Sequence, residues 1–123
     1  MSPYLYVAIG GAIGACLRYF LVIESTKLLG KGFPFGTLLV NVIGSFLLGC
    51  LYAWLNNFDV LSNNLRLLLG VGLLGALTTF STFSFDTFML LQSGFILKAA
   101  LNILINVSVC IFAVWLAFLL VKG

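Results

Sequence analysis

Hydroxyl and aromatic side chains alternate in one apolar stretch of this sequence, and both kinds of group can contact a small ion. Residues 72–86 read GLLGALTTFSTFSFD, in which threonines and serines alternate with phenylalanines. Hydroxyl groups donate hydrogen bonds to an anion, and an aromatic ring presents a positive edge. No carboxylate that would draw in a cation lies in the middle of this stretch. These residue types favour contact with a small, strongly hydrated anion.

Amide side chains supply a second set of donors. Asn102, Asn106 and Cys110 follow one another at four-residue spacing, which places them on one face of a helix. Asn41 interrupts another apolar stretch, and burying its amide in hydrocarbon is costly unless the amide has a partner. Two explanations stay open for these residues. They form a polar track for an ion, or they form hydrogen bonds that join helices.

Catalytic chemistry has little support in this sequence. There is no histidine, and the acidic residues are Glu24, Asp59 and Asp86. We expect Glu24 and Asp59 to lie in loops and Asp86 to lie near one end of a helix, so that no pair of acids meets at one depth. The cysteines sit in apolar runs without the spacing of a metal site. We therefore expect no enzymatic activity.

The elements that must position these groups are apolar helices. Of the 123 residues, 63% are hydrophobic and 7% are charged, which is too few charges for the surface of a soluble domain. About 20 helical residues cross a hydrocarbon core of about 30 Å. The sequence predicts an all-α integral membrane protein in which residues 1–123 form a single four-helix transmembrane domain. The predicted spans are residues 4–23, 35–55, 67–91 and 99–121.

The third span carries the most unusual composition. It is longer than a straight crossing requires, and its middle, residues 75–84, contains one glycine, three threonines and two serines. Such a composition weakens a helix, and a break inside a membrane is tolerated only where it faces protein or water. Broken helices of this kind form ion sites in transporters. The sequence predicts a third helix broken at mid-membrane, over residues 77–80.

The first span combines small residues with an arginine. Gly10 and Gly14 form a GxxxG pair, which predicts close helix packing. Arg18 lies about 21 Å along the helix, counted at about 1.5 Å per residue. An arginine inside a membrane is costly and marks a functional position, here a water-filled vestibule, unless it simply extends to the surface. We predict that Arg18 pairs with Asp86 or shares one vestibule with it.

The loop charges bear on orientation and assembly. Four spans put both termini on one face with Arg66 and Lys122, while Lys27, Lys31 and Lys98 lie on the other face. The positive-inside rule needs a clear imbalance between the two faces, and here it is nearly absent. We expect the chain to insert in both orientations, so that opposed copies form an antiparallel dual-topology homodimer.

Three motifs together resemble one known family. They are GGAIGACLRY at residues 10–19, GTLLVNVIGSFLLG at residues 36–49, and GLLGALTTFSTFSFD at residues 72–86. In content and order they resemble the first three helices of the Fluc (CrcB) family of small bacterial fluoride channels. The resemblance covers essentially the whole chain. It implies a fluoride ion channel with two pores, formed by an antiparallel homodimer in the bacterial plasma (inner) membrane.

The resemblance also implies roles for individual residues. Phe80 and Phe83 would contact fluoride through their ring edges. Other pore residues implied by the match are Asn41, Ser81, Thr82 and Thr37. A structural Na⁺ at the dimer interface would be held by the backbone carbonyls of Gly75 and Thr78. The family commonly carries Tyr and Ser on its fourth helix, where this chain has Asn102, Asn106 and Cys110.

The implied role is export of fluoride down its electrochemical gradient, which protects the cell from fluoride toxicity. Its partners would be fluoride, the lipid bilayer and a second copy of the chain, with no nucleic acid. One rival is a small multidrug-resistance transporter, which needs a glutamate inside its first helix, where this chain has Arg18. Another rival is a non-conducting assembly subunit, which would not explain the hydroxyl-rich break.

Overall fold

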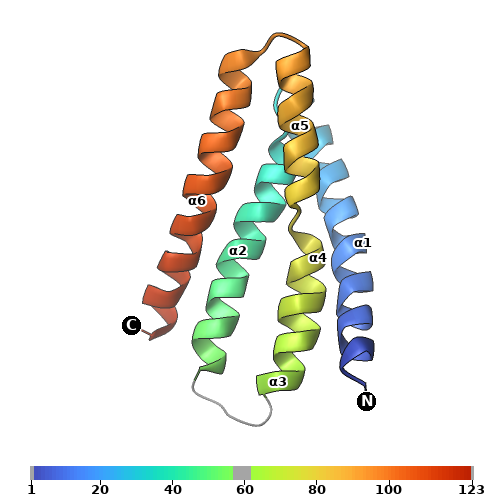
Figure 1. Cartoon of the computed structure of the whole chain (residues 1–123), viewed down its shortest axis with the longest axis vertical. Coiled ribbons are helices and arrows are strands. Elements are labelled where there is room, and N and C mark those ends of the chain that lie inside the picture. The colour runs from blue at the N-terminus through green and yellow to red at the C-terminus, as the bar shows by residue number, and fades with distance from the viewer. Residues whose placement is uncertain (1, 57–61, 123) are drawn as a thin grey trace.

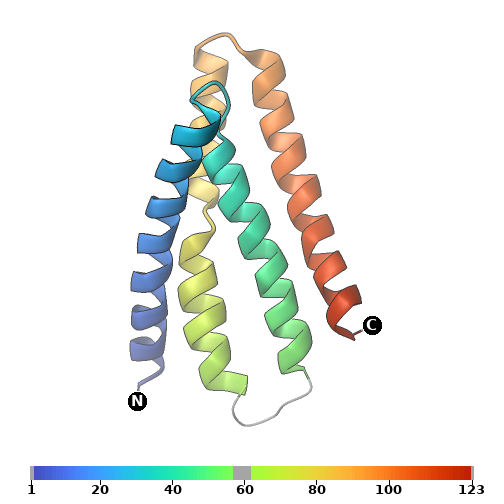
Figure 2. The same ribbon diagram turned by 180° about the vertical axis from the view of Figure 1, so that it is seen from behind.

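The computed structural model describes residues 2–56 and 62–122, and all of its regular elements are helices (Figures 1 and 2). Four segments of the described chain are long and apolar enough to cross a bilayer. They are Pro3–Leu29, Phe35–Leu55, Asn63–Gln92 and Ile96–Val121. The prediction of four membrane-spanning segments is therefore confirmed. The two chain ends lie towards the same end of the molecule, at the bottom of Figure 1.

The helices begin and end at residues suited to those positions. In chain order the elements are α1 (Pro3–Leu29), α2 (Phe35–Leu55), α3 (Ser62–Leu65), the π-helix η1 (Arg66–Leu74), α4 (Gly75–Leu77), α5 (Phe80–Gln92) and α6 (Ile96–Lys122). The Ser2 hydroxyl accepts a hydrogen bond from the backbone N–H of Tyr4 at the start of α1. Gly30 and Gly94, which follow α1 and α5, both have a φ of 85°. Glycine adopts this conformation without steric cost, which allows the tight turns there.

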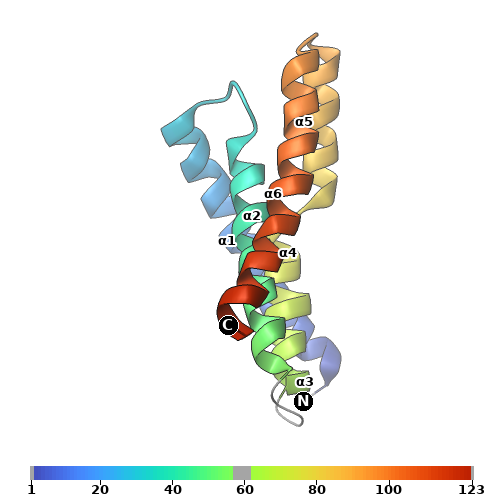
Figure 3. The ribbon, with the colours of Figure 1, turned by 90° about the vertical axis from the view of Figure 1, so that its left-hand side faces the viewer.

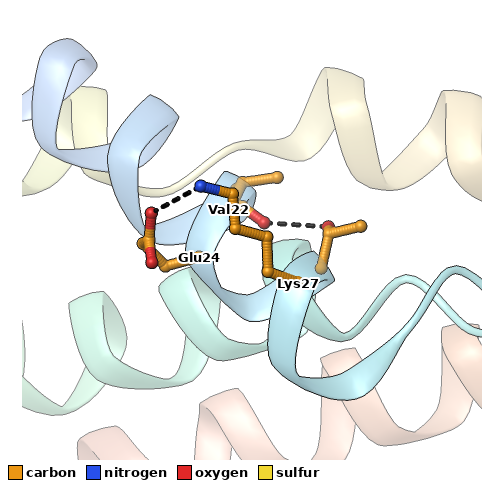
Figure 4. Close-up of polar contacts among 4 residues, drawn as sticks. Val22, Glu24 and Lys27 are labelled. Carbon is orange, nitrogen blue, oxygen red and sulfur yellow. Dashed lines mark hydrogen bonds and ion pairs between the residues drawn. The ribbon is translucent and has the colours of Figure 1, made fainter.

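Helix α1 is longer than the sequence predicts. It continues to Leu29, so Glu24 lies in a helix and its expected place in a loop is wrong. Glu24 forms an ion pair with Lys27, one turn further along α1, in which Lys27 Nζ lies 3.4 Å from Glu24 Oε1 (Figure 4). Both side chains are substantially exposed, so the pair contributes little stability. The pairing of opposite charges one turn apart allows both residues to remain in the helix. Asp59, also expected in a loop, lies outside the described residues.

Small residues bring α1 against η1. A Cβ atom placed on Gly10 would overlap the carbonyl oxygen of Leu68, and one on Gly14 would overlap the carbonyl oxygen of Leu73. Gly72 of η1 packs just as closely against α1, because a Cβ on Gly72 would lie 2.8 Å from the carbonyl oxygen of Val7. Backbones approach this closely only where side chains are absent. The close packing predicted from the GxxxG pair is confirmed, and its partner is η1 of the same chain.

Helix α2 lies in the middle of the molecule. It packs against α6, where a Cβ on Gly49 would lie 2.8 Å from the Cβ of Ala117. On another side, Val40 joins Leu74 and Leu77 in a buried core. Figure 3 shows that the α1–α2 connection and the α5–α6 hairpin separate at one end of the molecule. That separation leaves room for a cavity between them, described below.

Most of the helix surface is apolar and faces outward. In the four candidate spans, only 11–28% of the most apolar window is buried inside the protein. Within the described part of the chain, every buried side-chain nitrogen and oxygen has a hydrogen-bond partner. A protein in lipid shows this combination, because the interior must satisfy its own polar groups while the outside stays apolar.

Candidate functional site

The site is built around an interruption between α4 and α5. Thr78 and Thr79 have extended backbones, with ψ of 158° and 124°, and α5 begins at the next residue. The hydroxyl of Thr79 accepts a hydrogen bond from the backbone N–H of Thr82 at 3.1 Å and so caps α5. Threonine favours this position because its hydroxyl replaces a missing helical acceptor. The interruption falls within residues 77–80, where the sequence predicts a break.

Asn41 of α2 holds the interrupted backbone. Its Oδ1 accepts a hydrogen bond from the backbone N–H of Thr79 at 2.8 Å, and its Nδ2 donates to the carbonyl oxygen of Thr79 at 3.2 Å. One side chain thus satisfies both backbone groups of Thr79. Gly44, one turn along α2, lacks a Cβ that would overlap the side chain of Thr78. Together these contacts bring α2 directly against the interruption.

A groove of about 380 Å³ runs beside this contact, and we refer to it as the central groove. It is lined by Asn41, Ser45, Leu48, Thr78, Thr79, Phe80, Phe83, Asn106, Val107, Cys110 and Ile111. The rings of Phe80 and Phe83 have centroids 5.5 Å apart and planes inclined at 56°. Phe83 is 8% exposed, whereas Phe80 is 76% exposed and projects from the chain. The groove is therefore lined by aromatic rings, amides, hydroxyls and a thiol, and none of the side chains that line it is charged.

A second cavity, of about 470 Å³, lies at the end of the molecule where the α1–α2 connection and the α5–α6 hairpin separate. We call it the end cavity. Thr37 and Thr82 contribute hydroxyls to its lining, and Asp86 contributes a carboxylate. The hydroxyl of Thr37 donates a hydrogen bond to Oδ2 of Asp86 at 2.8 Å, which joins α2 to α5. Sequence reasoning missed this pair, because the two residues are 49 positions apart in the sequence.

Two lysines also line the end cavity. Lys31 stands in the α1–α2 connection, and Lys98 stands in the first turn of α6. The Lys98 ammonium donates a hydrogen bond to the carbonyl oxygen of Gly32 at 3.0 Å and lies 4.7 Å from the ring centroid of Phe95. Lys98 therefore spans the space between α6 and the α1–α2 connection. The lining of the end cavity therefore includes two lysine side chains and one acidic side chain.

The structure separates the predicted site residues into three groups. Phe80, Phe83, Asn41, Asn106 and Cys110 line the central groove. Thr37 and Thr82 line the end cavity instead. Ser81 is exposed and lines neither space, and its hydroxyl lies 3.4 Å from that of Thr79.

Asn102 belongs with Ser81 in the third group, because it is fully buried and also lines neither space. Its Nδ2 donates to the hydroxyl of Thr87 at 2.9 Å, and its Oδ1 accepts from Nδ2 of Asn106 at 3.0 Å. For Asn102 the structure supports the second of the two explanations, a hydrogen bond between helices. The four-residue spacing did place it on the same face as Asn106, but that face is covered by α5 at this level.

Arg18 takes a different partner from the one predicted. Its Nε donates a hydrogen bond to the carbonyl oxygen of Ala76 at 3.0 Å, at the end of α4. A cation is favoured there, because the last carbonyls of a helix lack partners. No ion pair joins Arg18 to Asp86 within residues 2–56 and 62–122, so the predicted pairing is wrong. Arg18 also does not line the end cavity with Asp86, so a shared vestibule is not supported.

Comparison with known proteins assigns the family. A model of the CrcB-like protein family, described as camphor resistance (CrcB), matches residues 5–118. A protein of Pseudoalteromonas translucida, strain TAC 125, is 56% identical over 115 residues, which are 94% of this chain and 96% of the relative. A protein of Alteromonas mediterranea is 53% identical over 123 residues, which are 100% and 97% of the two chains.

A third relative, from Shewanella woodyi, is 57% identical over 116 residues, which are 94% of this chain and 93% of the relative. All three relatives are named fluoride-specific ion channel FluC. That name describes an ion channel and not an enzyme, as we predicted for this chain, and it leaves no place for a multidrug-resistance transporter. With the family model matching nearly its whole length, the chain belongs to the CrcB-like family and is a multi-pass membrane protein.

Proposed function

We propose that this chain conducts fluoride across the bacterial plasma (inner) membrane. The observation that carries the proposal is the central groove, where the rings of Phe80 and Phe83 stand beside hydroxyl groups and where no carboxylate is present. Neutral donors bind an anion weakly enough to release it again, which rapid conduction requires. The name of the relatives, at 53–57% identity, supports fluoride as the ion.

Two consecutive residues of α5 connect the proposed route. Thr82 faces the end cavity and Phe83 faces the central groove. An ion that enters the end cavity meets the hydroxyl of Thr82, beside the Thr37–Asp86 hydrogen bond, and then passes to the rings in the groove. Ser81 extends the hydroxyl-lined part of the route from the exposed side of α5. Thr78 has fifteen residues of the span Asn63–Gln92 before it and fourteen after it, which supports a mid-membrane depth for the break.

The conducting unit is an antiparallel homodimer with two pores. One copy leaves the groove open at Phe80, which is 76% exposed, so a lone chain would place the ion against lipid. A second, inverted copy covers the groove and contributes its own phenylalanines. The near-equal numbers of basic residues at the two ends support insertion in both orientations. Labelling of a cysteine introduced at Lys31 would test this in intact cells, and reaction from one side only would contradict it.

A structural Na⁺ at the dimer interface forms part of the proposal. The carbonyl oxygens of Gly75 and Thr78 fit such an ion, because the interruption removes the helical N–H partners of both and leaves Gly75 only a long contact of 3.5 Å with the Thr78 hydroxyl. The N–H of Thr79 bonds to Asn41 and not to Gly75, and the N–H of Thr82 bonds to the Thr79 hydroxyl and not to Thr78. Oxygen atoms are the ligands that hard cations prefer. Replacing sodium with N-methylglucamine should lower the melting temperature of the purified protein.

The physiological role that follows is export. In an acidic environment, hydrogen fluoride enters the cell as an uncharged molecule and dissociates inside. Fluoride then leaves through the channel down its electrochemical gradient. Expression of the chain in a bacterium that lacks its own fluoride exporter should restore growth in millimolar fluoride. A failure to restore growth, with the protein present in the membrane, would contradict this role.

A further inference from the structure

Six side-chain and backbone groups, joined by five hydrogen bonds, form one continuous chain that leaves the start of α5 and returns to that helix. It starts at the N–H of Thr79 and runs through α2 and α6 to the carbonyl oxygen of Phe83. The bonds are Thr79 N to Asn41 Oδ1 at 2.8 Å, Asn41 Nδ2 to Asn106 Oδ1 at 3.1 Å, Asn106 Nδ2 to Asn102 Oδ1 at 3.0 Å, Asn102 Nδ2 to Thr87 Oγ1 at 2.9 Å, and Thr87 Oγ1 to Phe83 O at 2.8 Å. We call this set the amide chain.

The two ends determine the direction of every bond in the amide chain. The backbone N–H of Thr79 can only donate, and the carbonyl oxygen of Phe83 can only accept. Asn41 must therefore turn its oxygen towards Thr79, which turns its nitrogen towards Asn106. The same logic fixes Asn106 and then Asn102 in turn. No amide can reverse without placing two donors or two acceptors against each other, so the chain has one arrangement.

The Nδ2 groups of Asn41 and Asn106 already donate all of their hydrogen bonds within the protein. Both Nδ2 hydrogens of Asn41 have acceptors, the carbonyl oxygen of Thr79 and Oδ1 of Asn106. Nδ2 of Asn106 likewise donates to the carbonyl oxygen and to Oδ1 of Asn102. Asn102 is 0% exposed and Thr87 is 8% exposed. These last two groups therefore cannot touch an ion in the central groove, and any effect they have on it acts through the residues they hold.

We propose that Asn102 and Thr87 are positioning residues that place the rings of Phe80 and Phe83 for anion selection. The amide chain fixes the backbone at Thr79 and at Phe83, which are four residues apart and enclose the first turn of α5. Both rings project from this turn. The inference rests on the proposed fluoride conduction. It assigns a role in that conduction to two residues that the ion does not contact. Loss of the chain shifts the rings, which lowers fluoride flux and weakens discrimination against chloride.

Thr87→Val tests the inference, because it keeps the shape of the side chain and removes its hydroxyl. We expect fluoride flux from liposomes, measured per folded protein, to fall about tenfold, because the first turn of α5 and its two rings shift when Asn102 loses its acceptor. The ratio of chloride to fluoride flux should rise. Thr87→Ser keeps the hydroxyl and should restore both quantities. Ser108→Ala, on the exposed side of α6 and outside the amide chain, is the matched control and should match the unmodified protein.

The ratio separates positioning from a purely structural role. A variant that only reduced the number of folded channels would lower both fluxes and leave their ratio unchanged. An unchanged ratio in Thr87→Val would overturn the inference, as would full flux in that variant. If Thr87→Val yields no folded protein, Asn102→Leu carries the same expectation and the same contradicting outcomes. Absence of fluoride flux in the unmodified protein would instead refute the proposed function, and this inference with it.

Discussion

The side chain of Asn41 pairs with the backbone of Thr79, accepting from its N–H at 2.8 Å and donating to its carbonyl oxygen at 3.2 Å. Helix α2 thus replaces the helical partners that Thr79 lacks in the interruption. An extended segment inside an apolar protein is stable only with such replacements. The same side chain lines the central groove, so the group that permits the break also forms part of the proposed ion route.

Asn41→Ala should therefore destabilise the protein and stop conduction. The change leaves the N–H and carbonyl oxygen of Thr79 without partners, which costs about 1–3 kcal/mol of folding free energy. Thermal unfolding of the purified protein would show a lower melting temperature, and fluoride flux should be lost. Asn63→Ala, on exposed α3, serves as the control and should change neither. An Asn41→Ala protein with normal stability would show that the pairing is dispensable.

The two groove phenylalanines should be required for flux. Phe80→Ile or Phe83→Ile keeps an apolar side chain but removes the positive ring edge. Either change should abolish most fluoride flux and leave the size of the purified assembly unchanged by gel filtration. Phe88→Ile is a suitable control, because Phe88 lies on the same helix, is 54% exposed and lines neither the central groove nor the end cavity. Unaffected flux in the groove variants would refute the ring-edge contact.

Close packing between α1 and η1 should tolerate a methyl group at one glycine and not at another. Gly10→Ala places a Cβ against the carbonyl oxygen of Leu68, whereas Gly11→Ala has no neighbour closer than 4.0 Å. Overpacking of this kind costs about 1–3 kcal/mol. Gly10→Ala should lower the melting temperature clearly, and Gly11→Ala should not. Equal melting temperatures for the two variants would show that the backbones do not approach as closely as the structure places them.

The thiol of Cys110 reports whether the central groove holds water. A methanethiosulfonate reagent reacts with thiolates, which form only where water reaches the sulfur. In a Cys16→Ser, Cys50→Ser background, the reagent should block fluoride flux by attaching to Cys110, which lines the groove. Further replacement of Cys110 by serine should remove the sensitivity. Block that persists without Cys110, or no block with it, would contradict a wet groove at this position.

The residue types and their local order predicted the four spans and five of the eleven residues that line the central groove. Long apolar runs identify spans, and the hydroxyl-rich segment around Thr79 lies where the structure interrupts the third span. Contacts between distant segments could not be predicted in this way. Periodicity placed Asn102 and Asn106 on one face of α6, but only the packing of α5 shows that Asn102 is buried. Arg18 has a backbone partner, Ala76, that becomes available only because α4 ends there.

The charged end of α1 shows a second limit of the sequence. Glu24 and Lys27 suggested a loop, because charges are costly inside a membrane. They remain helical because they are one turn apart and pair with each other at an exposed position. Hydropathy alone therefore underestimates a helix that extends beyond the apolar core. The Thr37–Asp86 contact was missed for a related reason, since neither residue has a local signal that points to the other.

The central claim, that this chain conducts fluoride selectively, is tested most directly by ion release from liposomes. The purified protein would be reconstituted into liposomes loaded with potassium fluoride or potassium chloride, and efflux would be started with valinomycin and followed with ion-selective electrodes. The account predicts rapid release of fluoride and nearly no release of chloride, with fluoride release lost in Phe83→Ile. Chloride release at a rate comparable to that of fluoride, or no fluoride release above protein-free liposomes, would contradict it.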